Sequence, residues 1–238
     1  YQVGFTVKRK TIFVLNGYYL PGYKAGGPIR TLANIVEWLG DDFNFKVVTR
    51  DRDSGDREPY AGISKSSWNK VGQAHVRYVD LTYSSFSELQ QIIQESNPDI
   101  IYLNSFFDST FTQKVLLLRK LGRLPNVPII LAPRGEFSEG ALAIKKNKKK
   151  AYIFLARLTG FYKNITWHAS SLLEKKDIQK VFHGVQHKNI HIALNLAPKF
   201  NKNSLNQEKT KEIDKLKVVF LSRISPMKNL DYALRVLS

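Results

Sequence analysis

Short apolar runs alternate with amphipathic stretches along almost the whole chain. The apolar runs have the length and β-rich character of buried strands, and they fall at residues 11–15, 43–49, 75–79, 99–103, 127–131, 165–168 and 190–194. The amphipathic stretches predict helices at residues 28–39, 85–96, 109–121, 139–158 and 171–182. Ser85 and Ser171 each stand three residues before a glutamate, which is the capping-box pattern of a helix start.

This alternation predicts parallel βαβ units and therefore an α/β fold with an open, doubly wound, mostly parallel, Rossmann-like sheet. Such sheets bind ligands in the crevice beyond the carboxyl ends of their strands. The loops that follow the predicted strands are therefore the places to look for chemistry.

The pattern is interrupted by a polar segment rich in Asn, Lys, Gln and Glu. We expect a first domain at residues 1–200, a linker at 201–215 and the start of a second Rossmann-like domain at 216–238. The second domain would begin with a strand at 218–221 and a helix from about Met227.

Composition narrows the partners. The formal net charge of +17 favours anionic partners such as nucleic acid, lipid headgroups or phosphorylated small molecules, although a generally lysine-rich protein would show the same charge. The chain has no cysteine, which excludes disulfides and thiolate metal sites. No apolar run reaches the roughly 20 residues of a membrane span and no signal peptide is visible, so we expect a cytoplasmic protein.

Gly26 and Gly27 precede Pro28 in the loop between the first predicted strand and helix. Glycine lets a backbone approach a ligand closely, and a helix N-terminus presents free N–H groups that suit phosphate. A tight turn that needs glycine for its own geometry explains the pair equally well.

Arg134 and Glu136 lie in the loop after the strand at 127–131. Arg134 is a bidentate donor for phosphate or carboxylate, and Glu136 is a candidate acid or base. The alternative is an ion pair between the two residues that braces the loop.

Five lysines crowd into six positions of the helix predicted at 139–158, namely Lys145, Lys146, Lys148, Lys149 and Lys150. A solvated helix face is the ordinary explanation of such a run. A basic helix that faces anionic lipid or a lipid-diphosphate acceptor is the sharper one. The sequence shows none of the usual nucleic-acid-binding motifs.

Other polar groups are weaker candidates. Asp51-Arg52-Asp53 has the D-x-D form of a metal and diphosphate site, but it opens a polar loop after a strand. The five histidines show no metal-ligand spacing, so no metal site is expected. The capping box accounts for Glu174 as a structural residue.

Arg223 and Lys228 flank a turn at the start of the last predicted helix. Two cations beside free backbone N–H groups suit a diphosphate, whose charge grows as it leaves. Two unrelated surface cations fit the same spacing.

The segment 217–238 resembles the opening of the donor domain of GT-B glycosyltransferases of family 4, the glycosyl transferases group 1. Three earlier segments resemble the acceptor domain of that family: Gly26-Gly27-Pro28, Ala132-Pro133-Arg134-Gly135 with its lysine-rich helix, and the segment 167–174. The four landmarks occur in the family's order.

The resemblance implies a retaining, metal-independent transfer, without a cofactor, of a sugar from a nucleotide-diphosphate sugar to a hydroxyl acceptor. A lipid-linked saccharide of surface polysaccharide synthesis is the acceptor expected, at the inner face of the cytoplasmic membrane. Arg223 and Lys228 match the pair that binds the donor diphosphate, and Gly27 matches the loop near it. Arg134 stands where many members carry a histidine, which leaves its role open.

The family's E-x7-E element, which contacts the sugar and ribose, would lie beyond Lys228 and is not present. We therefore expect the 238 residues by themselves to be inactive or barely active. The alternative function is a basic Rossmann-like binding module for anionic lipid or nucleic acid. A sugar-nucleotide epimerase is a weaker alternative, because the G-x-G-x-x-G motif is absent.

Overall fold

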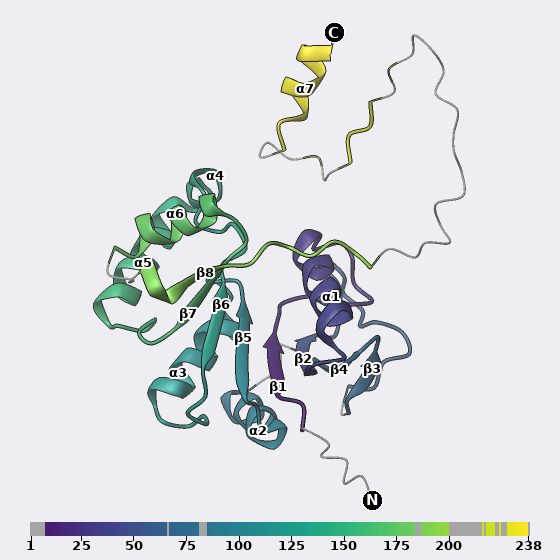
Figure 1. Cartoon of the computed structure of the whole chain (residues 1–238), viewed down its shortest axis with the longest axis vertical. Coiled ribbons are helices and arrows are strands. Elements are labelled where there is room, and N and C mark those ends of the chain that lie inside the picture. The colour runs from purple at the N-terminus through teal and green to yellow at the C-terminus, as the bar shows by residue number, and fades with distance from the viewer. Residues whose placement is uncertain are drawn as a thin grey trace, which may run out of the picture. The chain divides into compact units, whose positions relative to one another are not determined.

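The computed structural model of the chain describes residues 8–65, 67–80, 85–183, 187–199, 216, 218–221, 224 and 228–237. The chain divides into two separate units, residues 1–199 and 200–238. The first unit is an α/β domain built on one sheet (Figure 1).

Within the described residues the sheet has eight strands in the order β3-β4-β2-β1-β5-β6-β7-β8. All neighbouring strands are parallel except β3 and β4. The strands are β1 (Thr11–Leu15), β2 (Asn44–Arg50), β3 (Asn69–Val71), β4 (Ala74–Val79), β5 (Ile100–Asn104), β6 (Ile129–Ala132), β7 (Thr166–Ala169) and β8 (Ile190–Ile192). The predicted doubly wound, mostly parallel sheet is thus confirmed.

Helices cover both faces of the sheet (Figure 1). They are α1 (Gly27–Leu39), α2 (Phe86–Ser96), the π-helix η1 (Ser109–Gln113), α3 (Lys114–Lys120), α4 (Glu139–Ala143), α5 (Lys146–Leu158), α6 (Leu172–Val181) and the short 3-10 helix η2 (His187–Asn189). Side chains of α1 join the core on one face, and those of α2, α3, α5 and α6 join the core on the other.

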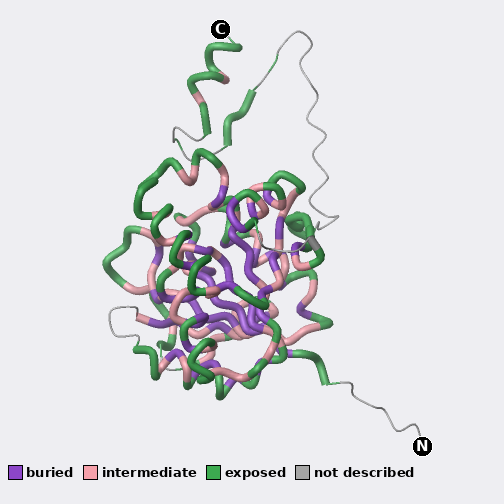
Figure 2. The backbone as a smooth tube through the Cα atoms, turned by 90° about the vertical axis from the view of Figure 1, so that its left-hand side faces the viewer, coloured by how far each residue is buried: buried purple, intermediate pink, exposed green. Residues whose placement is uncertain are grey.

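Successive side chains of a strand alternate between these two core clusters, one on each face of the sheet. Phe13 and Leu15 of β1 belong to the larger cluster, whereas Val14 belongs to the smaller one. All three are fully buried (Figure 2). Because parallel strands are buried on both faces, they appear in the sequence as continuous apolar runs.

The serines of both predicted capping boxes cap the starts of helices. The Ser85 hydroxyl accepts from the Glu88 N–H at 3.1 Å, and the Ser171 hydroxyl accepts from the Glu174 N–H at 3.1 Å. Each bond satisfies one N–H group that has no partner within its helix, so α2 and α6 start where the sequence indicates.

Two sequence predictions need correction, and one strand is not predicted. The helix expected at 139–158 is two helices, because Ile144 is extended and Lys145 adopts a left-handed conformation with φ of 54° between them. The strand β3 is not predicted by the sequence pattern. In the second unit the helix α7 (Leu230–Leu237) forms, but residues 218–221 form no strand and are exposed. A strand needs a neighbour for its hydrogen bonds, and the described residues of that unit provide none.

A segment after β8, residues 193–199, returns across the domain to α1 (Figure 1). The Asn34 side chain donates to the carbonyl of Leu196 at 2.6 Å, and the Trp38 indole donates to the carbonyl of Ala197 at 2.8 Å. We call residues 193–199 the return segment. It thus connects β8, the last strand along the chain, with α1, the helix that follows β1.

Candidate functional site

The strand order reverses between β1 and β5, which places a topological switch point at the middle of the sheet. The chain winds from β1 towards β4 on one side and from β5 towards β8 on the other. Loops at the carboxyl ends of adjacent strands diverge at such a point, and the crevice between them is the usual ligand site. The loops with Gly26-Gly27 and with Arg134 both follow carboxyl ends at this edge.

Arg134 is held by oxygen atoms of three residues, two in β5 and one in the return segment. Its Nε and Nη2 atoms donate to Oδ1 of Asn104 at 3.0 and 2.9 Å, and Nη2 also donates to the Tyr102 hydroxyl at 2.6 Å. Its Nη1 atom donates to Oδ1 of Asn195 in the return segment at 3.2 Å. The planar guanidinium is thereby fixed in one orientation.

His168 extends this network on β7. Its Nε2 atom lies 2.8 Å from the carbonyl oxygen of Ala193, which can only accept, so Nε2 carries the proton. Nδ1 is then the acceptor and receives the Tyr102 hydroxyl proton at 2.6 Å. Burial, with a further effect of the Arg134 charge, holds the pKa of His168 below its ordinary value, which favours this neutral form.

All four bonds of Arg134 end on uncharged groups, and within the described ranges no carboxylate forms an ion pair with it. The partner Tyr102 stays neutral as well, because burial raises its pKa to about 12. Arg134 is itself partly buried, so its positive charge is only partly compensated by water. A half-buried cation with neutral partners is a place where an anion binds favourably.

Glu136 is not the partner of Arg134. Its carboxylate accepts from the Ser105 hydroxyl at 2.6 Å and from the N–H groups of Phe106 and Phe107 at 2.5 and 3.2 Å. Burial raises the pKa of this carboxyl group, while these bonds act in the opposite direction. The ion pair suggested by the sequence is therefore wrong, and Glu136 joins the loop after β6 to the loop after β5.

Glu174 also connects two neighbouring loops, here those after β6 and β7. The sequence does not indicate this role. The Ser171 cap is present, but the Glu174 carboxylate accepts from the Gly135 N–H at 2.7 Å and from the Ser170 N–H at 2.7 Å. The contact with Gly135 crosses 39 positions of the chain, and no local motif signals it. Glu174 thus fixes the loop that carries Arg134.

Backbone strain collects at the same edge. Ser105 and Arg134 have φ values of 85° and 56°, a region that residues with a side chain rarely occupy. Both follow the carboxyl ends of neighbouring strands, β5 and β6. Strain of this kind is maintained by surrounding contacts, here by Glu136 on Ser105 and by Asn104 on Arg134.

Gly26 and Gly27 lie at the start of α1, as predicted. Gly26 has φ of 82°, and no side chain in the described part of the chain caps the first N–H groups of the helix. A Cβ atom at Gly27 would meet none of the described residues within 4 Å. The structure thus leaves open space at this helix N-terminus.

The two aspartates of the D-x-D segment form bonds with other groups of the protein. Asp51 is buried and pairs with Arg52 at 2.7 Å and Lys65 at 2.9 Å. Asp53 accepts from the N–H groups of Tyr23 at 2.7 Å and Lys24 at 3.0 Å, which holds the loop before α1. Across the residues that the structure describes, no three His, Asp or Glu side chains are arranged to hold a metal ion.

A further pair at the switch point is not predicted from the sequence. Arg50 at the end of β2 lies 3.6 Å from Asp108, whose other oxygen caps the π-helix through the N–H groups of Thr110 and Phe111. A Cβ atom at Gly17 would come within 3.3 Å of the Asp108 carboxylate. The glycine therefore allows the loops after β1 and β5 to approach each other.

Four of the five clustered lysines are exposed, namely Lys145, Lys146, Lys148 and Lys150. Lys149 is half-buried; its ammonium donates to the carbonyl of Ala141 at 2.7 Å and lies 4.8 Å from the Phe107 ring centroid. Lys149 thus connects α4 to α5.

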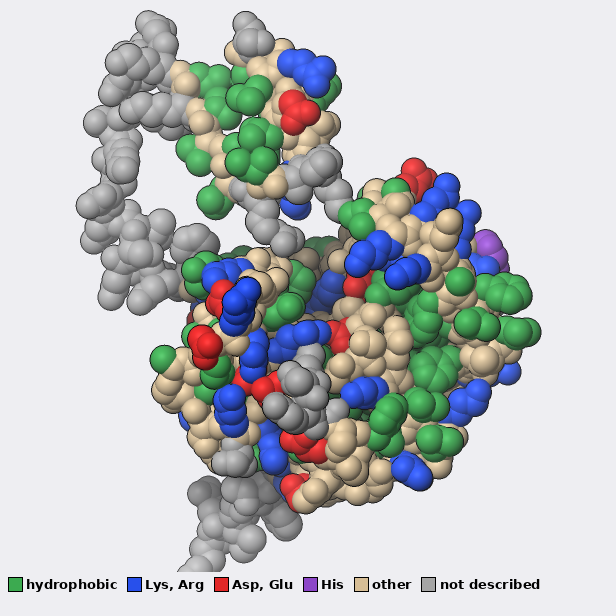
Figure 3. Space-filling view, turned by 180° about the vertical axis from the view of Figure 1, so that it is seen from behind, with side chains coloured by type: hydrophobic (Ala, Val, Ile, Leu, Met, Phe, Trp, Pro, Cys, Tyr) green, Lys and Arg blue, Asp and Glu red, His purple; other side chains and the backbone are tan. Residues whose placement is uncertain are grey.

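Exposed apolar side chains lie further along the same helix. Phe154, Leu155 and Leu158 of α5 expose more than half of their surface, and Figure 3 shows hydrophobic groups beside Lys and Arg on this side of the domain. Among the helices described, none has the length and apolar character needed to cross a membrane.

In the second unit, Lys228 is exposed and precedes α7. Its predicted partner Arg223 lies outside the described residues, so their pairing at a diphosphate stays a prediction.

Comparison with known proteins gives no family for this chain. No protein-family model matches it, and no curated protein matches it.

Proposed function

We propose that this chain carries the acceptor-side domain and the beginning of the donor-side domain of a GT-B glycosyltransferase. The reaction proposed is transfer of a sugar from a nucleotide-diphosphate sugar to a hydroxyl acceptor, with retention of configuration and without a metal ion. The proposal combines the resemblance of four sequence segments with the site at the carboxyl edge of the sheet.

The observation that supports it most is the Arg134 guanidinium with no acidic partner in the described part of the chain. Sugar transfer from a diphosphate develops negative charge on the leaving group. A fixed, partly desolvated cation stabilises such charge better than a solvated one, because its surroundings need not reorganise. Arg134 is suited to this role or to holding an anionic group of the acceptor.

The open start of α1 supports the same reaction. Its uncapped N–H groups and the open space around Gly27 suit a phosphate group that approaches the backbone closely. Asp53 fixes the preceding loop by two backbone bonds, so that this geometry is present before a ligand binds.

A lipid-linked acceptor at an anionic membrane surface is proposed as the partner. The exposed lysines of the α4–α5 region contribute electrostatic attraction, and Phe154, Leu155 and Leu158 supply apolar surface next to them.

The test uses the complete product of the reading frame that encodes these residues. It is incubated with a panel of nucleotide-diphosphate sugars and membrane-extracted acceptors, and the released nucleoside diphosphate and the glycosylated product are both measured. Arg134→Gln is expected to lower kcat/KM by about 10²–10³, a typical loss when one donor to a developing charge is removed. Arg123→Gln removes an exposed arginine elsewhere and should leave kcat/KM within a factor of two or so of the wild type.

Two further readouts separate this reaction from others. NMR of the first-formed product should show the anomeric configuration of the donor, and EDTA should leave the rate unchanged. Absence of transfer with every donor, together with salt-sensitive binding of DNA or anionic vesicles, would instead favour the basic binding module.

The membrane part has its own test. The wild type is expected to bind vesicles that contain phosphatidylglycerol, and replacement of the four exposed lysines by serine should weaken binding by roughly 1 kcal/mol per lysine. Lys149 stays unchanged, because it holds α4 against α5. The control replaces four exposed lysines elsewhere, namely Lys8, Lys10, Lys70 and Lys176. Equal losses in both quadruple variants would contradict a specific membrane surface.

A further inference from the structure

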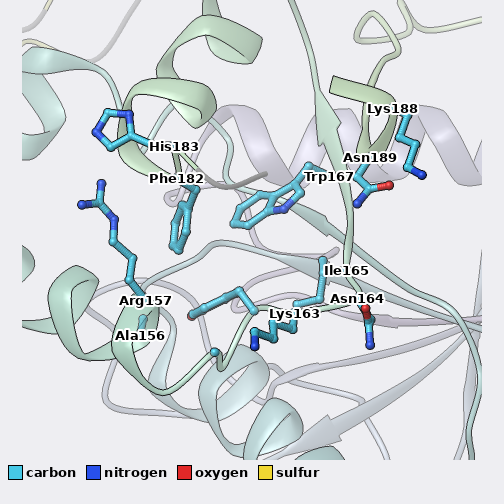
Figure 4. Close-up of a pocket in the computed structure, with 12 residues that line it drawn as sticks. Ala156, Arg157, Lys163, Asn164, Ile165, Trp167, Phe182, His183, Lys188 and Asn189 are labelled. Carbon is cyan, nitrogen blue, oxygen red and sulfur yellow. The ribbon is translucent and has the colours of Figure 1, made fainter. Parts of the chain in front are cut away.

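A pocket of about 660 Å³ lies at the amino ends of β7 and β8, at the opposite edge of the sheet from Arg134. It is bounded by the last turn of α5, the loop into β7, the end of α6 and the residues before β8 (Figure 4). Its volume lies within the range of small-molecule sites. Neither Arg134 nor Gly27 takes part in it, so its ligand is independent of the proposed sugar transfer.

The floor of the pocket is a rigid aromatic cluster. The Trp167 and Phe182 ring centroids are 5.1 Å apart, and Tyr162 lies 5.9 Å from Trp167 and 5.7 Å from Phe182. All three side chains are nearly or completely buried beneath the pocket. A packed floor of this kind makes the pocket preformed, which lowers the cost of binding a ligand.

The rim of the pocket is basic. Arg157, Lys163 and Lys188 are exposed around the aromatic floor, and Figure 4 shows His183 beside Arg157 and Asn189 beside Lys188. Among the described residues that line the pocket, none is acidic. Within the described ranges, none of the three cations forms an ion pair with a carboxylate.

The position of Lys163 is set by its backbone. Gly160 has φ of 61°, and a Cβ atom there would lie 2.9 Å from Cε of Lys163. The aliphatic part of Lys163 therefore lies directly against the glycine, while the Lys163 N–H donates to the Gly160 carbonyl at 3.0 Å. This close packing keeps the lysine at the rim.

The local sequence explains why the charge is not neutralised. Between Glu139 and Glu174 the chain has no acidic residue and seven basic ones. Two cations of α3 add to the positive electrostatic potential near the pocket. Arg119 donates to the carbonyl of Asn164, and Lys120 donates to the carbonyl of Thr159, both next to the pocket. The uncompensated charge at this edge thus comes from several helices and loops.

We propose that this pocket binds a small organic phosphate. Three cations from separate segments of the rim supply more positive charge than a single carboxylate needs, and they suit a doubly charged phosphate group. The volume exceeds that of a phosphate group, and the part of the pocket lined by Trp167 and Tyr162 suits an apolar or aromatic part of the ligand, while the Arg157 guanidinium lies 5.8 Å from the Phe182 ring centroid. A phosphorylated metabolite and the headgroup of an anionic lipid share this chemistry.

The test measures binding of phenyl phosphate and of inorganic phosphate to the purified chain by isothermal titration calorimetry. Phenyl phosphate is expected to bind more tightly than inorganic phosphate, because it alone reaches the aromatic side of the pocket. Arg157→Gln combined with Lys163→Gln should weaken phenyl phosphate binding about tenfold or more, the usual effect of losing hydrogen bonds to charged groups. Both residues are exposed, so the double variant should unfold at the same temperature as the wild type.

The matched control is Lys70→Gln, an exposed lysine on the edge strand β3, which should leave phenyl phosphate binding unchanged. Vesicles of phosphatidylcholine with and without phosphatidylglycerol identify the source of the phosphate. Vesicle binding that the double variant loses identifies a lipid headgroup, whereas vesicle binding that the double variant keeps, beside a loss of phenyl phosphate binding, identifies a soluble ligand. The proposal is overturned if phenyl phosphate does not bind or if the double variant binds it like the wild type.

Discussion

The Glu174 carboxylate accepts a hydrogen bond from the main-chain N–H of Gly135 at 2.7 Å, so a residue of α6 fixes the position next to Arg134. The same carboxylate accepts from the Ser170 N–H at 2.7 Å and from the Ser170 hydroxyl at 2.6 Å. Glu174 is buried, and it holds the loops after β6 and β7 together. The orientation of the candidate anion site therefore depends on a residue that need not touch the ligand.

Glu174→Ala is expected to lower the free energy of unfolding by about 2–3 kcal/mol, because donors in two loops lose a charged acceptor at once. Urea denaturation followed by circular dichroism measures this change. Glu139→Ala is the matched control, since the Glu139 side chain is 93% exposed, and it should change stability by less than about 0.5 kcal/mol. Equal effects of the two substitutions would contradict the role given to Glu174.

Acid should destabilise the domain through His168. Burial and Arg134 lower the pKa of His168 in the folded state, so the unfolded chain takes up a proton there before the folded one does. Stability is then fully present above about pH 6.5, the ordinary histidine value, and is lost as the pH falls towards the lowered pKa.

His168→Asn removes this titration, so the stability difference between wild type and variant should shrink as the pH falls from about 8 to about 5. Urea denaturation at several pH values measures it, and the values above about pH 7 serve as the internal reference. A difference that stays constant over this range would show that His168 titrates alike in both states.

The charges around His168 act in opposite directions, which gives a test of the network itself. Arg134 lowers the pKa of His168, whereas Glu174 raises it. NMR titration of the imidazole should show a higher pKa in Arg134→Gln and a lower one in Glu174→Gln. Arg123→Gln, which removes an exposed arginine elsewhere, should leave the titration as it is in the wild type. Shifts of the same sign in the first two variants would contradict the geometry.

The sheet is predictable because parallel strands are buried on both faces and leave continuous apolar runs in the sequence. The predicted positions of β1 to β8, apart from β3, agree with the structure to within about two residues at either end. The strand β3 has only the residues Asn-Lys-Val, and its antiparallel pairing with β4 leaves no apolar run to detect. The break between α4 and α5 is also hidden, because neither Ile144 nor Lys145 is a residue type that usually ends a helix.

The candidate site is predictable only in part. Arg134 attracts attention because arginine in a loop after a buried strand suits an anion. Tyr102, which accepts from Arg134, and His168, which accepts from Tyr102, lie within strands, where the sequence pattern assigns them to the core. Glu136 and Glu174 reach other loops through contacts that only the fold creates. Residue types thus indicate the chemistry, but long-range packing decides which groups meet.

Gly27 and Gly40 lie at opposite ends of α1, and substitutions at the two positions distinguish a functional role of glycine from a structural one. A Cβ atom at Gly27 would meet none of the described residues within 4 Å, whereas at Gly40 it would lie 2.5 Å from Cβ of Gln73 and 2.7 Å from the carbonyl oxygen of Val36. Gly27→Ala should therefore leave the free energy of unfolding unchanged or raise it by up to about 1 kcal/mol. Gly40→Ala should lower it by about 1–3 kcal/mol, because backbone atoms must move.

If a diphosphate approaches the start of α1 as proposed, the effects on activity should be the reverse of those on stability, with the larger loss in Gly27→Ala. A methyl group at residue 27 would push the phosphate away from the helix N-terminus, and a displacement of about 1 Å costs on the order of 10²-fold in rate. We therefore expect Gly27→Ala to lose most of its sugar transfer while remaining fully folded. Gly40→Ala should keep its activity at temperatures where it is folded. Steady-state kinetics with the complete protein, beside a thermal unfolding curve for each variant, provide the comparison. Full activity of Gly27→Ala would mean that the glycine serves only the turn before α1, and the phosphate site would then have to lie elsewhere along this edge of the sheet.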